Sequence, residues 1–242
     1  KPIYEIDTYD LRCYLALYKE RNKVSNRTLD GLRRCFSSFF SWLSAEGLTG
    51  RNPCAAIAQI KYTKTVKKPF SGPELEKLRA ACVTIRNRAL LEFLYATGCR
   101  VSEVVQLNLS DVDFRTGEIT VLGKGDKERV VYLTDVAAMY LQDYIRTRTD
   151  KNPCLFAWDR TPYNRLSKSA IESIMRKLGA VAEVANVHPH RYRRTLATNL
   201  LDKGAAIQDV AAILGHEDLK TTQIYCTISQ RNVKSSYQKY AA

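Results

Sequence analysis

Two short segments near the end of the chain concentrate side chains that bind anions and transfer protons. They are HPHRYRRT at residues 188–195 and LGHEDLKTTQIY at 214–225, and together they hold all three histidines of the chain. His190 and Arg193 are three residues apart on a predicted helix, so they share one of its faces. An isolated pair of this kind is more often an ordinary surface contact, so the pair alone does not identify a site.

Arg100, Lys124 and Tyr225 are also of types that could act on a phosphate. Arg100 stands in TGCRVSEV, where a Thr-Gly pair ends an apolar helix. Lys124 lies in a Gly-Lys-Gly-Asp turn, whose glycines allow another backbone to approach closely. Tyr225 ends an amphipathic segment, in which a tyrosine is usually a core residue. Taken alone, each has a structural explanation: a helix-start arginine, a solvated turn lysine and a buried ring.

The sequence predicts neither a metal site nor a disulfide framework. His188 and His190 flank a proline, no HExxH pattern is present, and no cysteine or carboxylate cluster has ligand spacing. The seven cysteines are scattered and never form a CxxC pair, which is typical of a reducing cytoplasm. No run of 18 apolar residues occurs, so we expect no membrane span.

The order of four segments along the chain is more informative than any one of them. TGCRVSEV, GKGDKERVVYL, HPHRYRRTLAT and LGHEDLKTTQIY follow one another between residues 97 and 225. They closely resemble the motifs T-G-x-R-x-S-E, G-K-G-x-K-x-R, P-H-x-x-R-x-T-x-A-T and L-G-H followed by T-x-x-Y, nine residues from the His to the Tyr, of the tyrosine recombinase (phage integrase, Xer-like) family. Residues 7–60 also resemble the helical core-binding domain of that family. The resemblance implies a site-specific DNA recombinase or integrase.

The resemblance also implies which residues form the active site, namely Arg100, Lys124, His190, Arg193, His216 and Tyr225. Glu103 matches the acidic residue that commonly follows the first arginine, and we expect it to orient Arg100. The chain departs from the family pattern in two places. Arg194 stands where the family often has His, and Cys226-Thr227 stands where it often has Thr or Ser followed by His. Neither departure falls on an expected catalytic position.

These residue types suit phosphodiester cleavage without a metal ion. Arg100 and Arg193 would donate paired hydrogen bonds to the non-bridging oxygens, and His216 would add a further donor. Tyr225, whose phenol has a reference pKa of about 10, would attack the phosphorus and form a 3′-phosphotyrosine. His190 is the candidate acceptor of the phenol proton, and Lys124 is the candidate general acid for the leaving 5′-hydroxyl. Religation would then need neither ATP nor a cofactor.

The charge balance independently favours double-stranded DNA as the partner. Lys and Arg number 38 against 25 Asp and Glu, which gives a formal charge of +13. Residues 1–68 hold 13 of the basic and 6 of the acidic side chains, so just over a quarter of the chain carries +7. Such an excess binds polyanions by releasing their counterions. The candidate DNA-binding residues are Arg27, Arg33, Arg34, Lys64, Lys67, Lys68, Lys127, Arg129, Arg191 and Arg194.

Helical periodicity predicts a small basic unit over residues 1–65. We expect one helix at 7–20, capped by Asp7 or Thr8, and a second at 25–47, capped by Ser25 and ended by Gly47. The basic stretch after this unit indicates a linker, which we place at 66–70. Because the unit is short for the family, we expect that one or two helices of the domain are missing before Lys1.

The second unit, residues 71–242, is predicted to be mainly helical with a small β-hairpin. It opens at Ser71, which has capping-box spacing to Glu74. Two β-branched runs, at 119–121 and 130–132, flank the Gly-Lys-Gly-Asp turn and predict the hairpin. The fold class is therefore mainly α with a small sheet (α+β), in two domains that would form a C-shaped clamp on DNA. Helices are expected at 72–82, 86–97, 101–107, 134–148, 167–178, 189–203, 206–214, 219–227 and near 230–240.

Assembly and location follow from the same resemblance. Segment 228–242 would dock on a neighbouring protomer, which gives a dimer per DNA site and a tetramer on two sites; the alternative is a helix packed on its own domain. We expect a bacterial, cytoplasmic, nucleoid-associated protein. Two other functions stay open at this point: a type IB topoisomerase, which relaxes DNA as a monomer, and a DNA-binding module without catalysis. The target DNA sequence and the kind of genetic element are not named by the residues.

Overall fold

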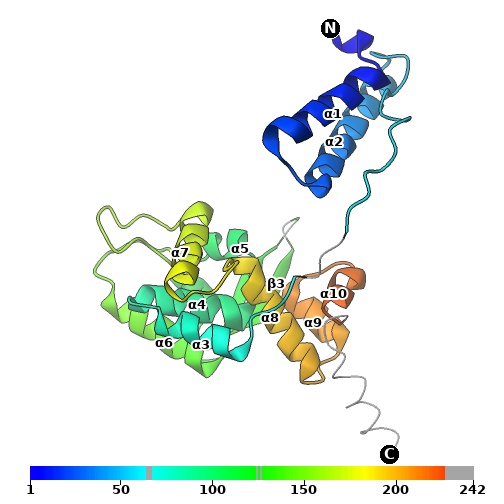
Figure 1. The fold of residues 1–242 in the computed structure, drawn as a ribbon. Helices are drawn as coiled ribbons and strands as arrows, with labels where there is room; N and C mark the ends of the chain where they lie inside the picture. Colours follow the sequence, from blue (N-terminus) through cyan, green and yellow to red (C-terminus); the bar gives the residue numbers. More distant parts are fainter. Residues whose placement is uncertain (64–66, 124, 126, 227–242) are drawn as a thin grey trace, which may run out of the picture. The chain divides into compact units, whose positions relative to one another are not determined.

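The computed structural model describes residues 1–63, 67–123, 125 and 127–226 (Figure 1). Contacts between residues divide the chain into two compact units, Lys1–Val66 and Lys67–Ala242. Lys64, Lys124, the helix expected near 230–240 and the segment 228–242 lie outside the described residues. Within the described part of the chain, no helix combines the length and apolar character needed to cross a membrane.

The first unit contains the 3-10 helix η1 (Ile3–Glu5), then α1 (Thr8–Asn22) and α2 (Asn26–Ala45). The predicted caps fix the starts of both α-helices. Asp7 accepts a hydrogen bond from the Asp10 backbone N–H, and Ser25 accepts one from that of Thr28. Both predicted helices are therefore confirmed, to within two residues at each end. They enclose a small core made of Leu11, Phe40, Leu43 and Cys54.

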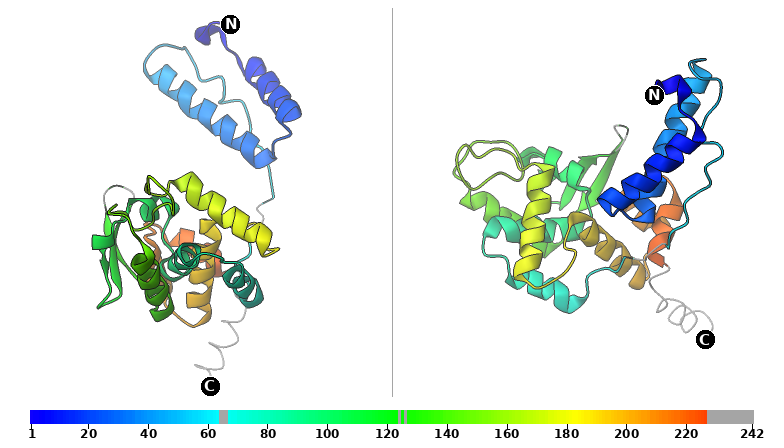
Figure 2. Two further views of the ribbon diagram at one scale, coloured as in Figure 1. Left: turned by 90° about the vertical axis from the view of Figure 1, so that its left-hand side faces the viewer. Right: turned by 45° about the horizontal axis from the view of Figure 1, so that its top comes forward.

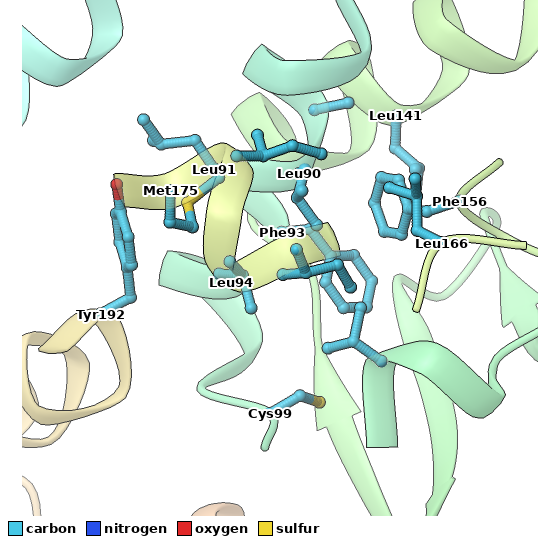
Figure 3. Packing of buried hydrophobic residues seen from close by; sticks show 14 of the residues in the cluster. Leu90, Leu91, Phe93, Leu94, Cys99, Leu141, Phe156, Leu166, Met175 and Tyr192 are labelled. Atoms are coloured by element: carbon cyan, nitrogen blue, oxygen red, sulfur yellow. The ribbon is translucent and has the colours of Figure 1, made fainter. Parts of the chain in front are cut away.

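The second unit is built around α4 (Ile85–Thr97), whose apolar side chains point in all directions. Such a helix is stable only where neighbours surround it. It lies against α6 (Asp135–Thr147) and α8 (Pro189–Asp202). Figure 3 shows Phe93 beside Phe156, and their ring centroids are 5.5 Å apart in an edge-on arrangement. The fully buried residues of α4 include Ala89, Leu90, Leu91, Phe93 and Leu94.

A three-stranded antiparallel sheet in the order β1-β2-β3 packs on this core. Ile119 and Val131 pair across the central ladder, and both are buried together with Val121. The alternation of buried and exposed residues places one face of β2 on the core. The predicted hairpin is confirmed, whereas β1 was not predicted because two residues carry no periodic signal. The strands are β1 (Val112–Asp113), β2 (Glu118–Leu122) and β3 (Glu128–Tyr132).

Several helices carry or support the motif segments. α3 (Gly72–Ala80) begins at the predicted Ser71–Glu74 capping box. Figures 1 and 2 show α8, α9 and α10 grouped together on one side of the unit, and contacts join all three pairs. The mainly helical fold with a small sheet is therefore confirmed. The remaining elements are α5 (Val101–Gln106), η2 (Leu109–Asp111), α7 (Lys168–Val181), α9 (Ile207–Leu214) and α10 (Leu219–Cys226).

Candidate active site

Arg100 is positioned by the turn between α4 and α5. Gly98 ends α4 in the left-handed conformation (φ 58°), and Arg100 directly precedes the first residue of α5. Its guanidinium donates hydrogen bonds to Glu103 Oε1 at 2.8 Å and to the carbonyl oxygen of Gly215 at 3.0 Å. About a third of the side chain remains exposed (32%). Arg100 is thus held from two sides but open to a ligand on a third.

Arg193 comes from the middle of α8 and is almost fully buried, with 2% of its surface exposed. It donates hydrogen bonds to the carbonyl oxygens of Gly98 (2.7 Å) and Leu214 (2.5 Å). Burial, and then the positive charge of Arg100, lowers the pKa of Arg193 to about 10. Leu214 and Gly215 therefore offer adjacent carbonyls to two different arginines, which brings their guanidiniums together.

His216 directly follows these two carbonyls. Its Nδ1 lies 2.7 Å from Oγ1 of Thr222, a residue of α10 that has no exposed surface. Burial, followed by the charges of Arg193 and Arg100, lowers the pKa of His216 to about 4. The imidazole is therefore neutral at pH 7, and Thr222 fixes the direction of its ring.

Tyr225 lies on α10, one helical turn beyond Thr222. Its ring stacks on that of His216, with centroids 6.3 Å apart and planes inclined by 21°. The half-buried side chain also packs on the small core between α8 and α9. Burial lowers the pKa of Arg193 and of Arg194, and the negative charge that Tyr225 would carry when deprotonated acts on both in the opposite direction. Tyr225 is therefore close to the arginines as well as to His216.

His190 lies in the first turn of α8 and is more exposed than the other site residues. Partial burial of its ring, and then the charge of Arg193, lowers the pKa of His190. Four predicted catalytic residues therefore converge in the second unit, with His190 at their edge. They are Arg100, Arg193, His216 and Tyr225. Lys124 lies outside the described residues.

Glu103 and Arg129 form a buried ion pair behind Arg100. Glu103 is 4% exposed, and Arg129 donates to its two carboxylate oxygens at 2.7 and 2.8 Å. Burial alone would raise the pKa of Glu103, but hydrogen bonds from Arg129 and Arg100 lower it overall. The guanidinium of Arg129 is engaged inside the protein, while its side chain also lines a cleft beside the β2–β3 hairpin, so the expected DNA contact of Arg129 stays a prediction.

Arg191 also departs from its expected role. It is buried, donates to the carboxylate of Glu74 and to the carbonyl of Ala185, and stacks over the ring of Phe70 at 4.1 Å. These contacts tie α8 to Phe70, to the first turn of α3 and to the loop that follows α7. Sequence spacing could not distinguish this buried arginine from its neighbours. Its burial and its internal partners argue against the DNA contact that was predicted for Arg191.

The other predicted DNA-binding residues are more accessible. Arg33 and Arg34 both approach the buried Asp30, and Arg33 does so more closely (2.9 Å). Lys127 is exposed and pairs with Glu217 at 2.7 Å. Arg194 is partly buried, whereas Arg27, Lys67 and Lys68 are exposed.

A cleft of about 420 Å³ opens beside the β2–β3 hairpin. Basic and acidic side chains both line it, together with one imidazole: Arg100, Lys127, Arg129, His216, Glu128, Glu217 and Asp218. Arg100 and His216 offer hydrogen-bond donors to a phosphate diester on this side of the cleft. Among the described residues, no group of three or more His, Cys, Asp or Glu side chains could hold a metal ion.

Comparison with known proteins shows which family the chain resembles. The model of the phage integrase family matches residues 55–231. The chain is 33% identical to tyrosine recombinase XerD of Oceanobacillus iheyensis over 98% of this chain and 82% of that protein. It is 35% identical to XerD of Proteus mirabilis over 97% of this chain and 78% of the relative. The crystal structure of XerA recombinase shares 28% identity with a TM-score of 0.65, covering this chain fully and 86% of the other.

Proposed function

The chain belongs to the phage integrase family and is a site-specific DNA recombinase, and we propose that Tyr225 is its nucleophile. The observation that carries this proposal is the convergence of Arg100, Arg193 and His216 beside the Tyr225 ring. The enzyme would be a DNA strand transferase that conserves the energy of the broken bond. It would require no metal ion, ATP or cofactor.

The arginines and His216 bind the scissile phosphate. Two guanidiniums donate to the non-bridging oxygens and stabilise the charge that builds up as a fifth oxygen approaches phosphorus. Thr222 can donate its hydroxyl proton to Nδ1 of His216, which leaves the proton of a neutral imidazole on Nε2. In this tautomer Nε2 becomes a third donor to the phosphate.

Covalent exchange then proceeds in two balanced steps. The phenol oxygen of Tyr225 bonds to phosphorus as its proton passes to His190, and the 5′-oxygen leaves with a proton from Lys124. The product is a 3′-phosphotyrosyl link and a free 5′-hydroxyl. The 5′-hydroxyl of another strand reverses the same step, so tyrosine leaves and the new phosphodiester has the energy of the old one.

Double-stranded DNA is the partner that we propose for both units. Residues 1–65 would bind one side of the duplex and residues 71–242 the other, joined by the linker at 66–70, in a C-shaped clamp. A structure of lambda integrase contains a dimer bound to a core site, which supports a dimer per site here. We further propose a tetramer on two sites, docked through segment 228–242, in the bacterial cytoplasm. Mobile-element integration and chromosome resolution are both compatible with this assembly.

A covalent trap tests the nucleophile directly. A duplex that the protein selects from a random library, nicked beside the scissile phosphate, should trap a protein–DNA adduct in EDTA. The short fragment that carries the released 5′-hydroxyl diffuses away, so it cannot reverse the cleavage. Tyr225→Phe should abolish the adduct while DNA binding stays within about twofold, since only the hydroxyl is removed. An adduct in the Phe variant would exclude Tyr225 as the nucleophile.

Two assays on the wild-type protein separate the other functions. Strand exchange between two site-bearing duplexes supports a recombinase, whereas relaxation of supercoiled DNA without exchange would indicate a topoisomerase. Binding without any adduct would indicate a module that has lost catalysis.

A further inference from the structure

Three arginines donate hydrogen bonds to three consecutive carbonyl oxygens at the end of α9. Ile213 accepts from Nε of Arg129 at 3.0 Å, Leu214 accepts from Arg193, and Gly215 accepts from Arg100. The last carbonyls of a helix have no intrahelical donor and carry the negative end of its dipole, so they attract cations. Arg100 and Arg129 line the cleft beside the hairpin, whereas Arg193 is almost fully buried. Arg129 reaches the helix end from strand β3.

The guanidinium of Arg100 donates one hydrogen bond to a carboxylate, whereas that of Arg129 donates two. Its Nη1 and Nη2 donate to Oε1 and Oε2 of Glu103 in a two-pronged pair, while its Nε is bonded to Ile213. Only 11% of the Arg129 side chain is exposed, against 3% for that of Glu103. This geometry fixes the plane of the Glu103 carboxylate, because a guanidinium fork permits one orientation of its partner.

Glu103 passes this orientation on to Arg100. Its Oε1 accepts from the Arg100 guanidinium at 2.8 Å, and its Oε2 accepts from the Arg100 backbone N–H at 2.6 Å. One buried carboxylate is therefore shared by two arginines that lie on different elements. Loss of Arg129 would leave this carboxylate held by Arg100 alone and would release the bond to the carbonyl of Ile213, which lies three residues before His216.

Gly215 leaves room for the Arg129 side chain. It has φ +64°, and a Cβ built at this position would lie 2.8 Å from Cδ and 3.1 Å from Nε of Arg129. The Arg129 stem therefore lies against the bare face of the turn that precedes His216. Both the conformation and the missing side chain of Gly215 are needed for this contact.

From these contacts we infer that Arg129 is a positioning residue for the DNA cleavage reaction. It orients Arg100 through Glu103 and holds the turn before His216 through Ile213. This role rests on the proposed function, since it matters only if Arg100 binds the scissile phosphate.

A double-mutant cycle tests the inference with single-turnover cleavage at saturating DNA. Arg129→Ala should slow cleavage by about tenfold to a hundredfold, because hydrogen bonds to a charged group are lost, and should change DNA affinity by less than about threefold. The double variant Arg100→Ala/Arg129→Ala should cleave at a rate within about threefold of that of Arg100→Ala alone, since the effects of residues that act through one another are not additive. If the rate reductions of the two single variants instead multiply in the double variant, Arg129 acts independently of Arg100 and the inference is overturned.

A matched arginine distinguishes positioning from general stability. Arg79 on α3 makes a comparable two-pronged pair with the buried Glu92 of α4, donating from Nε and Nη2 at 2.8 and 2.9 Å. Arg79→Ala should lower the melting temperature yet retain the wild-type cleavage rate per folded molecule. If Arg129→Ala shows the same pattern, with a stability loss alone, its role is merely structural and the inference fails. Should Arg129→Ala not fold, Arg129→Lys serves instead, because a lysine keeps the charge but cannot form the fork.

A modified substrate gives a readout that stability does not influence. A methylphosphonate at the scissile position removes one of the charged oxygens that Arg100 would bind. The rate penalty of Arg129→Ala should shrink by about tenfold or more on this substrate, as should that of Arg100→Ala. An unchanged penalty for Arg129→Ala alone would overturn the positioning role. A wild-type rate for Arg100→Ala on ordinary DNA would instead contradict the proposed function.

Discussion

The imidazole of His216 stacks on the phenol ring of Tyr225 although the two residues stand nine positions apart, with ring centroids separated by 6.3 Å. Thr222, on the same helix as Tyr225, also holds Nδ1 of His216. The helix that would deliver the nucleophile therefore also orients His216, which is the proposed hydrogen-bond donor to the phosphate. Displacing α10 would disturb both groups together, so cleavage should depend steeply on the docking of this helix.

Thr222→Val should reduce single-turnover cleavage by about tenfold, because a valine of the same shape cannot bond to the imidazole and the lost hydrogen bond is worth roughly 1–1.5 kcal/mol. Thr222→Ser retains the hydroxyl and should stay within about threefold of the wild-type rate. Equal rates for the Val and Ser variants would show that the hydroxyl does not orient His216. Thermal melts of both variants would confirm that they are folded.

Stability should fall as the pH is lowered from about 6.5 to 4. The pKa of His216 drops to about 4 on folding because burial and two arginines disfavour its charged form, whereas an unfolded histidine titrates near 6.5. In that window the unfolded chain binds more protons, so acid favours unfolding. The pKa values of His188 and His190 are lowered as well and act in the same direction.

Denaturant unfolding at pH 7 and pH 5 measures this dependence. His216→Asn should lose less stability between the two pH values than the wild type, because one of the contributing groups is gone. An identical loss in both proteins would show that His216 does not contribute.

Gly98→Ala should be more damaging than Gly204→Ala. Both glycines have positive φ, which costs roughly 1–2 kcal/mol for alanine. A Cβ at Gly204 would meet nothing within 4 Å, whereas one at Gly98 would lie 2.9 Å from Leu196 and 3.1 Å from Leu214. Since Gly98 also binds Arg193, its variant should lose cleavage activity as well as about 1 kcal/mol of additional stability. Comparable unfolding free energies and rates would contradict this.

Alanine variants of Arg191 and Lys67 should distinguish a residue that stabilises the fold from one that binds DNA. Arg191→Ala removes a buried guanidinium with several partners and should destabilise the protein by about 2 kcal/mol, while the salt dependence of DNA binding stays the same. Lys67→Ala changes an exposed residue and should lower the slope of log K against log salt by about 1. A changed slope for Arg191→Ala would restore it as a DNA contact.

Lys124→Ala should slow cleavage of ordinary DNA, since the leaving 5′-oxygen would lack its proton donor. A 5′-bridging phosphorothiolate has a thiol leaving group that needs no proton, so this substrate should recover most of the rate. Persistent slow cleavage of the phosphorothiolate by the variant would exclude Lys124 as the general acid.

The sequence by itself determined the local elements and the set of chemical groups. Ser25 and Ser71 marked helix starts because a cap depends on residues three positions away. The hairpin was readable because its strands alternate and are close in the chain. The motif segments also supplied Arg100, Arg193, His216 and Tyr225, and Thr222 stood inside the last of them as an unused signal.

Only the tertiary structure decided which basic side chains are open to a ligand and which are structural. Arg129 finds Glu103, 26 positions away, and Arg191 finds Glu74, 117 positions away. Such partners depend on how helices and strands pack, and a guanidinium has the same charge in a sequence whether it is buried or exposed. The same packing sets the pKa of His216, because burial and the fields of distant arginines come into being only when the chain is folded.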